Sequence, residues 1–490
     1  MSGLNPAFIG SFFGRLKRPD RFVVLCGLAV SAGIILRFCR LGEALWLDEV
    51  LSLNTASLGA AGILKDLAQG PSGANPPLFF LLLAGWMIFF PGTDASLHFF
   101  TALIGTLGVG IAWKVSAGLA GRRAGAAAAA LLALHPFHIA HSQELRTYGL
   151  LVIFTFLSFY FLERALEKDR WRDWLLFSAA GLACLYIHNY AIFLVAAEIA
   201  AGAAASFSSP AKRRKLIVAA VIMLAGFAPW IPVVALQAVK PTHAPLHTTT
   251  FHDVGLTLRS LFGLYVSAGE SAASPLHPGL LFALACSAFA AFCAPVSAGR
   301  NRRLLSHMLG ITAFSLLAPA LISLKIPIYN GGRHSIIALP FVCIIMGWCV
   351  SSLKSEKWRI GALGFLLAMQ GLTVLFYFHT PKSYNREIAG YLRVVDSPGF
   401  EIIIPDFFMK PPVCRYYPPA RRARAALMEY PPGEFPDGII TVQIRNKPTD
   451  SFRLPGVPAH YREISGKSFG NFALVRVWEK QHMLPGTKKK

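Results

Sequence analysis

The chain has 490 residues, of which 54% are hydrophobic and only 15% are charged, and its mean hydropathy is +0.51. This composition excludes an ordinary soluble protein and predicts repeated membrane-spanning segments. The net charge of +22 comes from short clusters between apolar runs rather than from one basic surface, which argues against a nucleic-acid partner.

The apolar segments predict about eleven membrane spans. They lie at residues 22–38, 97–119, 124–139, 148–162, 174–188, 190–206, 216–238, 276–296, 305–324, 334–353 and 360–378. The first span follows basic residues and is long enough to remain as a signal-anchor rather than to be cleaved as a signal peptide. The run at 77–91 is short for a span, and we expect it to lie flat at the outer surface or to be re-entrant.

This arrangement places all the basic clusters on one side of the membrane, which the positive-inside rule identifies as cytoplasmic. The clusters are Lys17, Arg18 and Arg21; Arg122 and Arg123; Arg164, Lys168, Arg170 and Arg172; Lys212, Arg213, Arg214 and Lys215; Arg300, Arg302 and Arg303; and Lys354, Lys357 and Arg359. The N-terminus is then cytoplasmic, and the first outer loop, residues 39–95, faces the opposite side.

The composition changes after His379. The runs EIIIPD, DGIITVQI and FALVRVW are typical of strands, whereas NREIAGYLRVV has the spacing of a helix. We therefore predict a membrane module at residues 1–378 and a small α/β domain on the outer face at residues 379–490.

An acidic pair, Asp48 and Glu49, stands in the apolar stretch RLGEALWLDEVLSLNT of the first outer loop. In a helix over residues 43–54 these two carboxylates share one face with Ser52, and leucines and Val50 cover the rest. Two interpretations are open at this point. The face is either simply solvated, or it holds a partly desolvated carboxylate that acts as a general base.

Four stretches together resemble glycosyltransferase family 39, whose members use polyprenyl-phosphate sugars and include protein O-mannosyltransferases and the aminoarabinose transferases of lipid A. The stretches are LGEALWLDEVLSL, NPPLFFLLL, GRRAGAAAAALLALHPFHIAHSQELRTYGLL and NGGRHSIIALP. The likeness covers roughly residues 20–350, is strongest over residues 40–165 and does not include the tail.

The resemblance implies an α-helical polytopic membrane protein with a GT-C-like fold. It implies a hexosyl- or pentosyltransferase in a bacterial-type cytoplasmic membrane, which takes a sugar from a polyprenyl-phosphate donor with inversion. The acceptor is a glycolipid, a glycan or a protein, and proteins are the less favoured because the loops lack the extended domain of eukaryotic O-mannosyltransferases.

By the same resemblance, Asp48 is the residue that acts on the acceptor, and Glu49 supports it or a divalent ion. Arg333 looks like the phosphate-contacting arginine of the family, and a guanidinium suits that task because it binds phosphate through two N–H groups. An arginine that merely reaches toward the membrane surface is the alternative. Lys325 and His334 are further candidates nearby.

The second outer loop contributes Glu144 and Arg146, which match a polar pair of the family and are expected to bind sugar hydroxyls or to steady Asp48. Tyr148 either joins them or anchors the membrane interface.

The same loop contains His135, His138 and His141 at intervals of three residues, which raises the question of a metal site. Pro136 interrupts the helix that would align these histidines. A divalent cation therefore stays among the expected cofactors without assigned ligands.

Two rival classes share the many spans. A transporter or flippase of glycolipid precursors typically places ionisable residues near the centres of its spans, where Glu198 is the main carboxylate. A noncatalytic scaffold has no need of Asp48, Glu49 and Arg333 in the outer loops.

Overall fold

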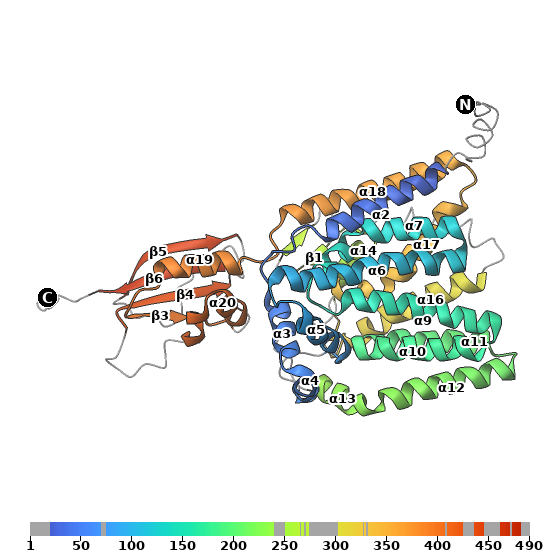
Figure 1. Ribbon diagram of the computed structural model, residues 1–490, viewed down its shortest axis with the longest axis horizontal. Coiled ribbons are helices and arrows are strands. Elements are labelled where there is room, and N and C mark those ends of the chain that lie inside the picture. Colours follow the sequence, from blue (N-terminus) through green and yellow to red (C-terminus); the bar gives the residue numbers. More distant parts are fainter. Residues whose placement is uncertain are drawn as a thin grey trace, which may run out of the picture.

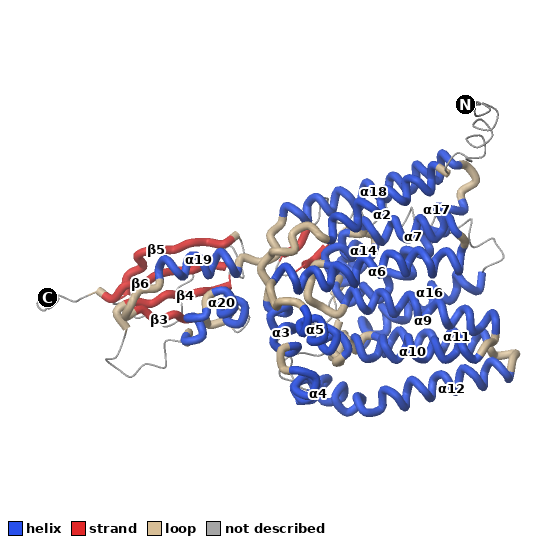
Figure 2. Tube along the Cα trace, viewed as in Figure 1, coloured by secondary structure: helices blue, strands red, loops and turns tan. Residues whose placement is uncertain are grey.

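The computed structural model describes residues 20–69, 75–239, 250–264, 266–268, 271–273, 302–326, 328–329, 332–406, 409–424, 436–444, 461–470 and 473–481. A bundle of helices, called here the helical body, carries at one end a smaller unit of strands and short helices, called the sheet unit (Figures 1 and 2). The predicted span at 276–296 lies outside the described residues.

The helical body contains the described elements up to residue 379. They are α2 (Arg21–Arg37), α3 (Leu47–Ala56), α4 (Gly59–Gln69), α5 (Leu78–Phe89), α6 (Asp94–Ala120), α7 (Arg122–Leu134), α8 (Pro136–Ser142), α9 (Tyr148–Lys168), α10 (Trp171–Ile187), α11 (Ala191–Ala205), α12 (Pro210–Phe227), η1 (Ala228–Trp230), α13 (Ile231–Val239), α14 (Phe251–Leu261), the short strands β1 (Val266–Ala268) and β2 (Ser271–Ala273), α16 (Arg302–Ile322), η2 (Arg333–Ala338), α17 (Leu339–Ser352) and α18 (Glu356–His379).

Six of the described helical runs are long and apolar enough to cross a membrane, and each coincides with a predicted span. They are α6, α9, the run from α12 into α13, α16, the run from η2 through α17, and α18. The helices α2, α7, α10 and α11 also occupy predicted spans but have 17, 13, 17 and 15 residues. The structure divides the predicted span 124–139 at Pro136, which starts α8 because proline fits the first turn of a helix but not its interior.

Helix α7 packs closely against α2, α6 and α17. A Cβ atom added at Gly33 of α2 would lie 2.2 Å from the carbonyl oxygen of Ala133, and one added at Gly347 of α17 would lie 2.7 Å from the amide nitrogen of Ala128. No larger residue fits at either crossing. The alanine-rich sequence of α7 therefore serves close helix packing, as small residues do in membrane bundles.

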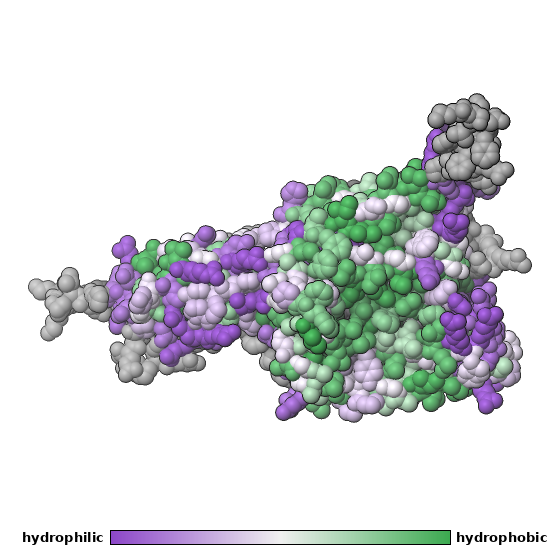
Figure 3. Space-filling view, in the orientation of Figure 1, coloured by the Kyte–Doolittle hydropathy of each residue, from purple (hydrophilic) through white to green (hydrophobic). Residues whose placement is uncertain are grey.

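The described basic clusters flank the α6–α7, α9–α10 and α17–α18 turns and the first turns of α2, α12 and α16. Ion pairs join these segments at one end of the body: Arg123 lies 2.8 Å from Asp20, and Lys215 lies 3.0 Å from Asp169. Hydrophilic residues gather at this end and over the sheet unit, with a hydrophobic surface between them (Figure 3). This is the pattern that the positive-inside rule leads us to expect of a membrane protein.

The first loop carries α3, α4 and α5, which pack against one another. Helix α5 has 12 residues, too few to cross a bilayer alone. A solvated polar face for α3 is wrong: Glu49 and Ser52 are buried, while Asp48 keeps 25% of its side chain exposed. The reason is a set of partners for Glu49 from distant segments, which the pattern of α3 itself does not reveal.

The sheet unit consists of α19 (Asn385–Val395), β3 (Phe400–Ile403), α20 (Lys410–Tyr416), η3 (Pro418–Arg422), β4 (Gly438–Ile444), β5 (Tyr461–Phe469) and β6 (Ala473–Lys480). The strand order is β3-β4-β6-β5, with β3 parallel to β4 and the other pairs antiparallel. Ile440, Val442 and Val475 form its core with Ile388 and Leu392 of α19. Strands β3, β4 and β6 and helix α19 lie where the sequence predicts them, and the domain division at residue 379 stays a prediction.

Asp94, the first residue of α6, binds the sheet unit to the helical body. Its carboxylate accepts hydrogen bonds from Arg415 Nη2 at 2.6 Å, Arg386 Nη2 at 2.7 Å and the Tyr416 hydroxyl at 2.8 Å. Only 9% of the Asp94 side chain is exposed, so these charges interact in a partly dehydrated setting.

We predict that Asp94→Asn weakens this attachment, because the amide cannot neutralise two guanidinium groups. The expected loss is about 2 kcal/mol of unfolding free energy, seen as a lower midpoint of thermal unfolding in detergent. Asp437→Asn is the matched control, since Asp437 is exposed and only its backbone groups are hydrogen-bonded among the described residues. Equal midpoints for the two variants would contradict the prediction.

Candidate active site

Asp48, Arg146 and Arg333 meet at the end of the helical body that bears the sheet unit. Arg333 Nη1 lies 3.3 Å from Asp48 Oδ2, and Arg146 Nη2 lies 3.6 Å from the same oxygen. Arg146 also donates from Nη1 to the backbone carbonyl of Asp48 at 3.4 Å. Each arginine side chain is 17% exposed. The group is thus a partly open site with one carboxylate and two guanidinium groups.

Three separate segments place these side chains. Asp48 lies in the first turn of α3, where the helix dipole favours a negative charge. Arg146 lies in the short connection between α8 and α9. Arg333 follows Gly332, whose φ of +98° is readily adopted only by glycine, and Ser335 Oγ donates to the Gly332 carbonyl at 2.6 Å.

Aromatic rings flank both guanidinium groups. The guanidinium carbon of Arg333 lies 4.5 Å from the ring centroid of Trp46, and that of Arg146 lies 6.0 Å from the ring centroid of Tyr148. Cation–π contacts of this kind fix a guanidinium plane while its N–H edge stays available for an anion.

Glu49 is fully buried and has four polar partners. Its Oε1 accepts hydrogen bonds from Lys382 Nζ at 2.5 Å and from the Leu145 backbone N–H at 2.8 Å, and lies 3.0 Å from His98 Nε2. Its Oε2 accepts from the Trp46 backbone N–H at 3.1 Å. Burial alone would raise the pKa of Glu49, but Lys382 and His98 outweigh burial and lower it. An ionised, enclosed carboxylate suits a positioning role better than direct contact with substrate.

Glu144, two residues before Arg146, is also fully buried. His141 Nδ1 is 2.7 Å from its Oε2. Burial alone would raise the pKa of Glu144, but His141, Arg333 and Lys382 outweigh burial and lower that pKa to about 2. Glu144 therefore supplies a permanent negative charge beside the cationic groups.

The remaining predicted site residues differ in their placement. Tyr148 is 3% exposed, with its ring centroid 4.5 Å from that of His141. The ring of His334 lies 4.1 Å from that of Tyr190. Lys325 is exposed beyond the end of α16, and no described contact joins it to the arginines. The structure thus brings together all the predicted residues except Lys325: Asp48, Glu49, Glu144, Arg146, Tyr148, Arg333 and His334.

The three histidines of the second loop have separate partners. His135 Nε2 lies 3.1 Å from a backbone carbonyl, His138 Nδ1 lies 2.7 Å from Arg37 Nη2, and His141 contacts Glu144. Within the described part of the chain, no group of three or more His, Cys, Asp or Glu side chains is arranged to hold a metal ion. A divalent cation stays a prediction of the sequence.

Sequence reasoning missed Lys382 and His98. Lys382 belongs to the stretch TPKSYN at the start of the predicted domain 379–490, where a lysine is expected to be solvated. His98 lies near the start of a predicted span, and a histidine in that position is a weak signal of a buried polar contact.

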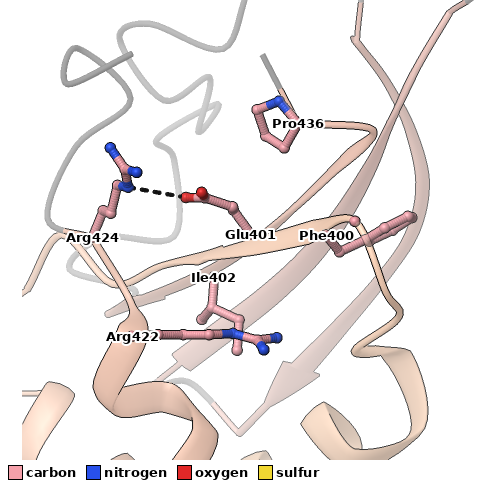
Figure 4. Close-up of a pocket in the computed structure, with 7 residues that line it drawn as sticks. Phe400, Glu401, Ile402, Arg422, Arg424 and Pro436 are labelled. Atoms are coloured by element: carbon pink, nitrogen blue, oxygen red, sulfur yellow. Dashed lines mark ion pairs between the residues drawn. The ribbon is translucent and has the colours of Figure 1, made fainter. Parts of the chain in front are cut away.

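The sheet unit has a hollow of its own, of about 420 Å³, lined by residues of β3 and by Arg422, Arg424 and Pro436. Arg424 points toward Glu401 and pairs with it at 3.2 Å (Figure 4). Arg422 pairs with Asp396 at 2.6 Å. Both arginines of this hollow thus have acidic partners within the sheet unit. The hollow contains none of the predicted site residues.

Comparison with known proteins agrees with the sequence resemblance. Residues 74–232 match the family model described as dolichyl-phosphate-mannose-protein mannosyltransferase, a range that includes Arg146 but neither Asp48 nor Arg333. No curated protein sequence matches the chain significantly.

Solved structures extend the likeness to most of the chain. ArnT from Cupriavidus metallidurans bound to undecaprenyl phosphate has a TM-score of 0.57 at 12% identity, over 94% of this chain and 98% of that one. Apo ArnT from the same organism gives 0.58 at 12% identity, over 92% and 97%. The oligosaccharyltransferase AglB from Archaeoglobus fulgidus, in complex with an inhibitory peptide and a dolichol-phosphate, gives 0.50 at 10% identity, over 83% and 64%. The predicted GT-C-like fold is confirmed.

We predict that Glu144 makes the protein sensitive to acid. The pKa of Glu144 falls from its ordinary value of 4.5 to about 2 on folding, so its stabilisation is complete above pH 4.5 and is lost as the pH falls toward 2. The midpoint of thermal unfolding in detergent should therefore drop between pH 5 and pH 3, and Glu144→Gln should reduce that drop. Glu387→Gln, which removes an exposed carboxylate, serves as the control, and an unchanged drop in Glu144→Gln would refute the assignment.

Proposed function

We propose that the protein is a membrane glycosyltransferase that moves a sugar from a polyprenyl-phosphate donor to a hydroxyl group of an envelope acceptor. The observation that carries the proposal is the convergence of Asp48 with Arg146 and Arg333 in one partly open site. The family match at residues 74–232, and the polyprenyl phosphates bound in the similar ArnT and AglB structures, support the same donor class.

The chemistry requires a base and an anion-binding group close together. The acceptor oxygen attacks the anomeric carbon opposite the phosphate, the bond from that carbon to the phosphate oxygen breaks, and the configuration inverts. The acceptor proton passes to the Asp48 carboxylate, and the bonding electrons leave with the polyprenyl phosphate. Arg333 neutralises the negative charge that develops on this leaving group.

The two arginines have different surroundings, and we assign them different roles. Arg146 holds both the carboxylate and the backbone carbonyl of Asp48, and so orients the base. Arg333 donates to the carboxylate of Asp48 at 3.3 Å and has the Trp46 ring on one face. A donor phosphate can therefore replace Asp48 as its anionic partner, which frees the carboxylate to accept a proton.

The position of the basic clusters at one end of the helical body supports the membrane orientation that we propose. The site and the sheet unit lie at the end of the body opposite the basic clusters. With the basic end in the cytoplasm, transfer takes place on the outer face of a bacterial-type cytoplasmic membrane.

Burial of the charges favours an enzyme over a transporter. Glu198 of α11, the carboxylate on which a transporter would depend, is fully buried and accepts a hydrogen bond from Ser158 Oγ at 2.6 Å. The partly exposed carboxylate of the site is Asp48, which lies in the first loop rather than within a span.

The test is transfer of radiolabelled sugar from extracted polyprenyl-phosphate donors in membranes that contain matched amounts of each variant. We expect Asp48→Asn, which lacks the base, and Arg333→Ala, which lacks the phosphate partner, each to lower transfer by about 100-fold or more. Asp437→Asn and Arg462→Ala are matched controls in the sheet unit, where both residues are exposed, and they should retain native transfer.

Full transfer by Asp48→Asn would remove Asp48 as the base. Absence of transfer by the native chain, with a broad panel of donors and acceptors, would refute the enzymatic proposal and favour a flippase of glycolipid precursors.

A further inference from the structure

Lys382 lies in the linker between α18, the last helix of the body, and α19, the first helix of the sheet unit. Its side chain is only 2% exposed, although the linker emerges from the bundle. The ammonium group donates to Glu49 Oε1 at 2.5 Å and to the backbone carbonyl of Gln143 at 2.8 Å, and lies 3.0 Å from His98 Nε2. A segment far along the chain thus supplies a cation for Glu49.

These contacts join the two loops that form the site. Glu49 is the neighbour of Asp48, and its Oε1 also accepts the backbone N–H of Leu145, the neighbour of Arg146. One carboxylate oxygen therefore binds the Arg146 segment directly, and through Lys382 it is joined to that segment a second time, at Gln143. The distance between Asp48 and Arg146 depends on this arrangement.

The linker, α19 and α20 hold the chain just before α3 as well. Asn385 Nδ2 donates to the Leu45 carbonyl at 3.1 Å, Ser383 Oγ donates to the Ala44 carbonyl at 3.3 Å, and the Leu45 N–H donates to the Tyr416 hydroxyl at 2.6 Å. The segment leading into α3 is thus bound by the linker and by two helices of the sheet unit.

We propose that Lys382 is a positioning residue of the transferase site, which through Glu49 fixes Asp48 of α3 relative to Arg146. The inference rests on the proposed function for its kinetic consequence, but the contact itself can be tested without it. A buried ion pair is a weak source of net stability, whereas the loss of one partner leaves an unpaired buried charge. The ion pair between Glu49 and Lys382 therefore serves to place the neighbouring base, Asp48, rather than to stabilise the fold.

The variants separate positioning from stability. Lys382→Met removes the lysine cation beside the buried Glu49 carboxylate and should lower the midpoint of thermal unfolding. The double variant Glu49→Gln/Lys382→Met removes both charges and should recover most of that midpoint, while the ion-pair contact between α3 and the linker stays absent. Lys382→Arg keeps the positive charge, and Lys357→Met, which changes an exposed lysine at the other end of α18, is the matched control.

Two readouts apply to each folded variant. Hydrogen exchange of the α3 amides should be faster in the double variant than in the native chain, because α3 opens locally when it lacks the ion pair between Glu49 and Lys382. The exchange of the α9 amides should be unchanged. Transfer by the double variant should show a kcat at least about tenfold lower, with the donor KM within about threefold of native, as expected when a reacting group is misplaced. Lys382→Arg should restore kcat in part, and Lys357→Met should match the native chain.

Native exchange of α3 together with native kcat in the double variant would overturn the inference. If the native chain transfers no sugar, the proposed function fails, and the exchange of α3 still decides whether Lys382 holds this helix.

Discussion

The burial of one ionised carboxylate, that of Glu49, determines how the candidate site is assembled. A charge enclosed in protein is tolerated only with opposite charge and hydrogen-bond donors around it. Glu49 obtains them from α6, from the loop after α8 and from the linker after α18. All these segments contact the same carboxylate oxygen of Glu49. The first loop, the second loop and the linker to the sheet unit are therefore fixed relative to one another, and Asp48 is fixed with them.

The helical body shows which features of the fold follow from sequence. The lengths of the apolar segments predict the long helices, and the short basic clusters predict which helix ends lie on the same side. Both features arise from local composition. The acidic pair, Arg146 and Arg333 are predicted as a site only through the resemblance to family 39. Nothing in the local pattern indicates that α3 and the loop after α8 meet, since that contact depends on tertiary packing across 98 residues of chain.

Misses have equally specific causes. Strand β5, with the sequence YREISGKSF, has only its end residues buried and occupies the edge of the sheet, so it lacks the apolar alternation that predicts strands. Lys382 lies in a polar linker, and its burial is created entirely by partners distant in sequence. Asp48 and Glu49 are predicted to share one face of a helix, but successive residues of a helix point in different directions, and here Asp48 is partly exposed whereas Glu49 is buried.

The ion pair between Glu49 and Lys382 also has a consequence for biosynthesis. The two residues are 333 positions apart, so the ribosome completes the last long helix of the body before the cation that pairs with Glu49 is synthesised. At that stage the partners of Glu49 are His98 and the backbone N–H groups of Leu145 and Trp46, and the contact of α3 with the linker is not yet made. A nascent chain inserted in the membrane therefore lacks this ion pair, and the site acquires it only after the linker that carries Lys382 has been synthesised and has docked.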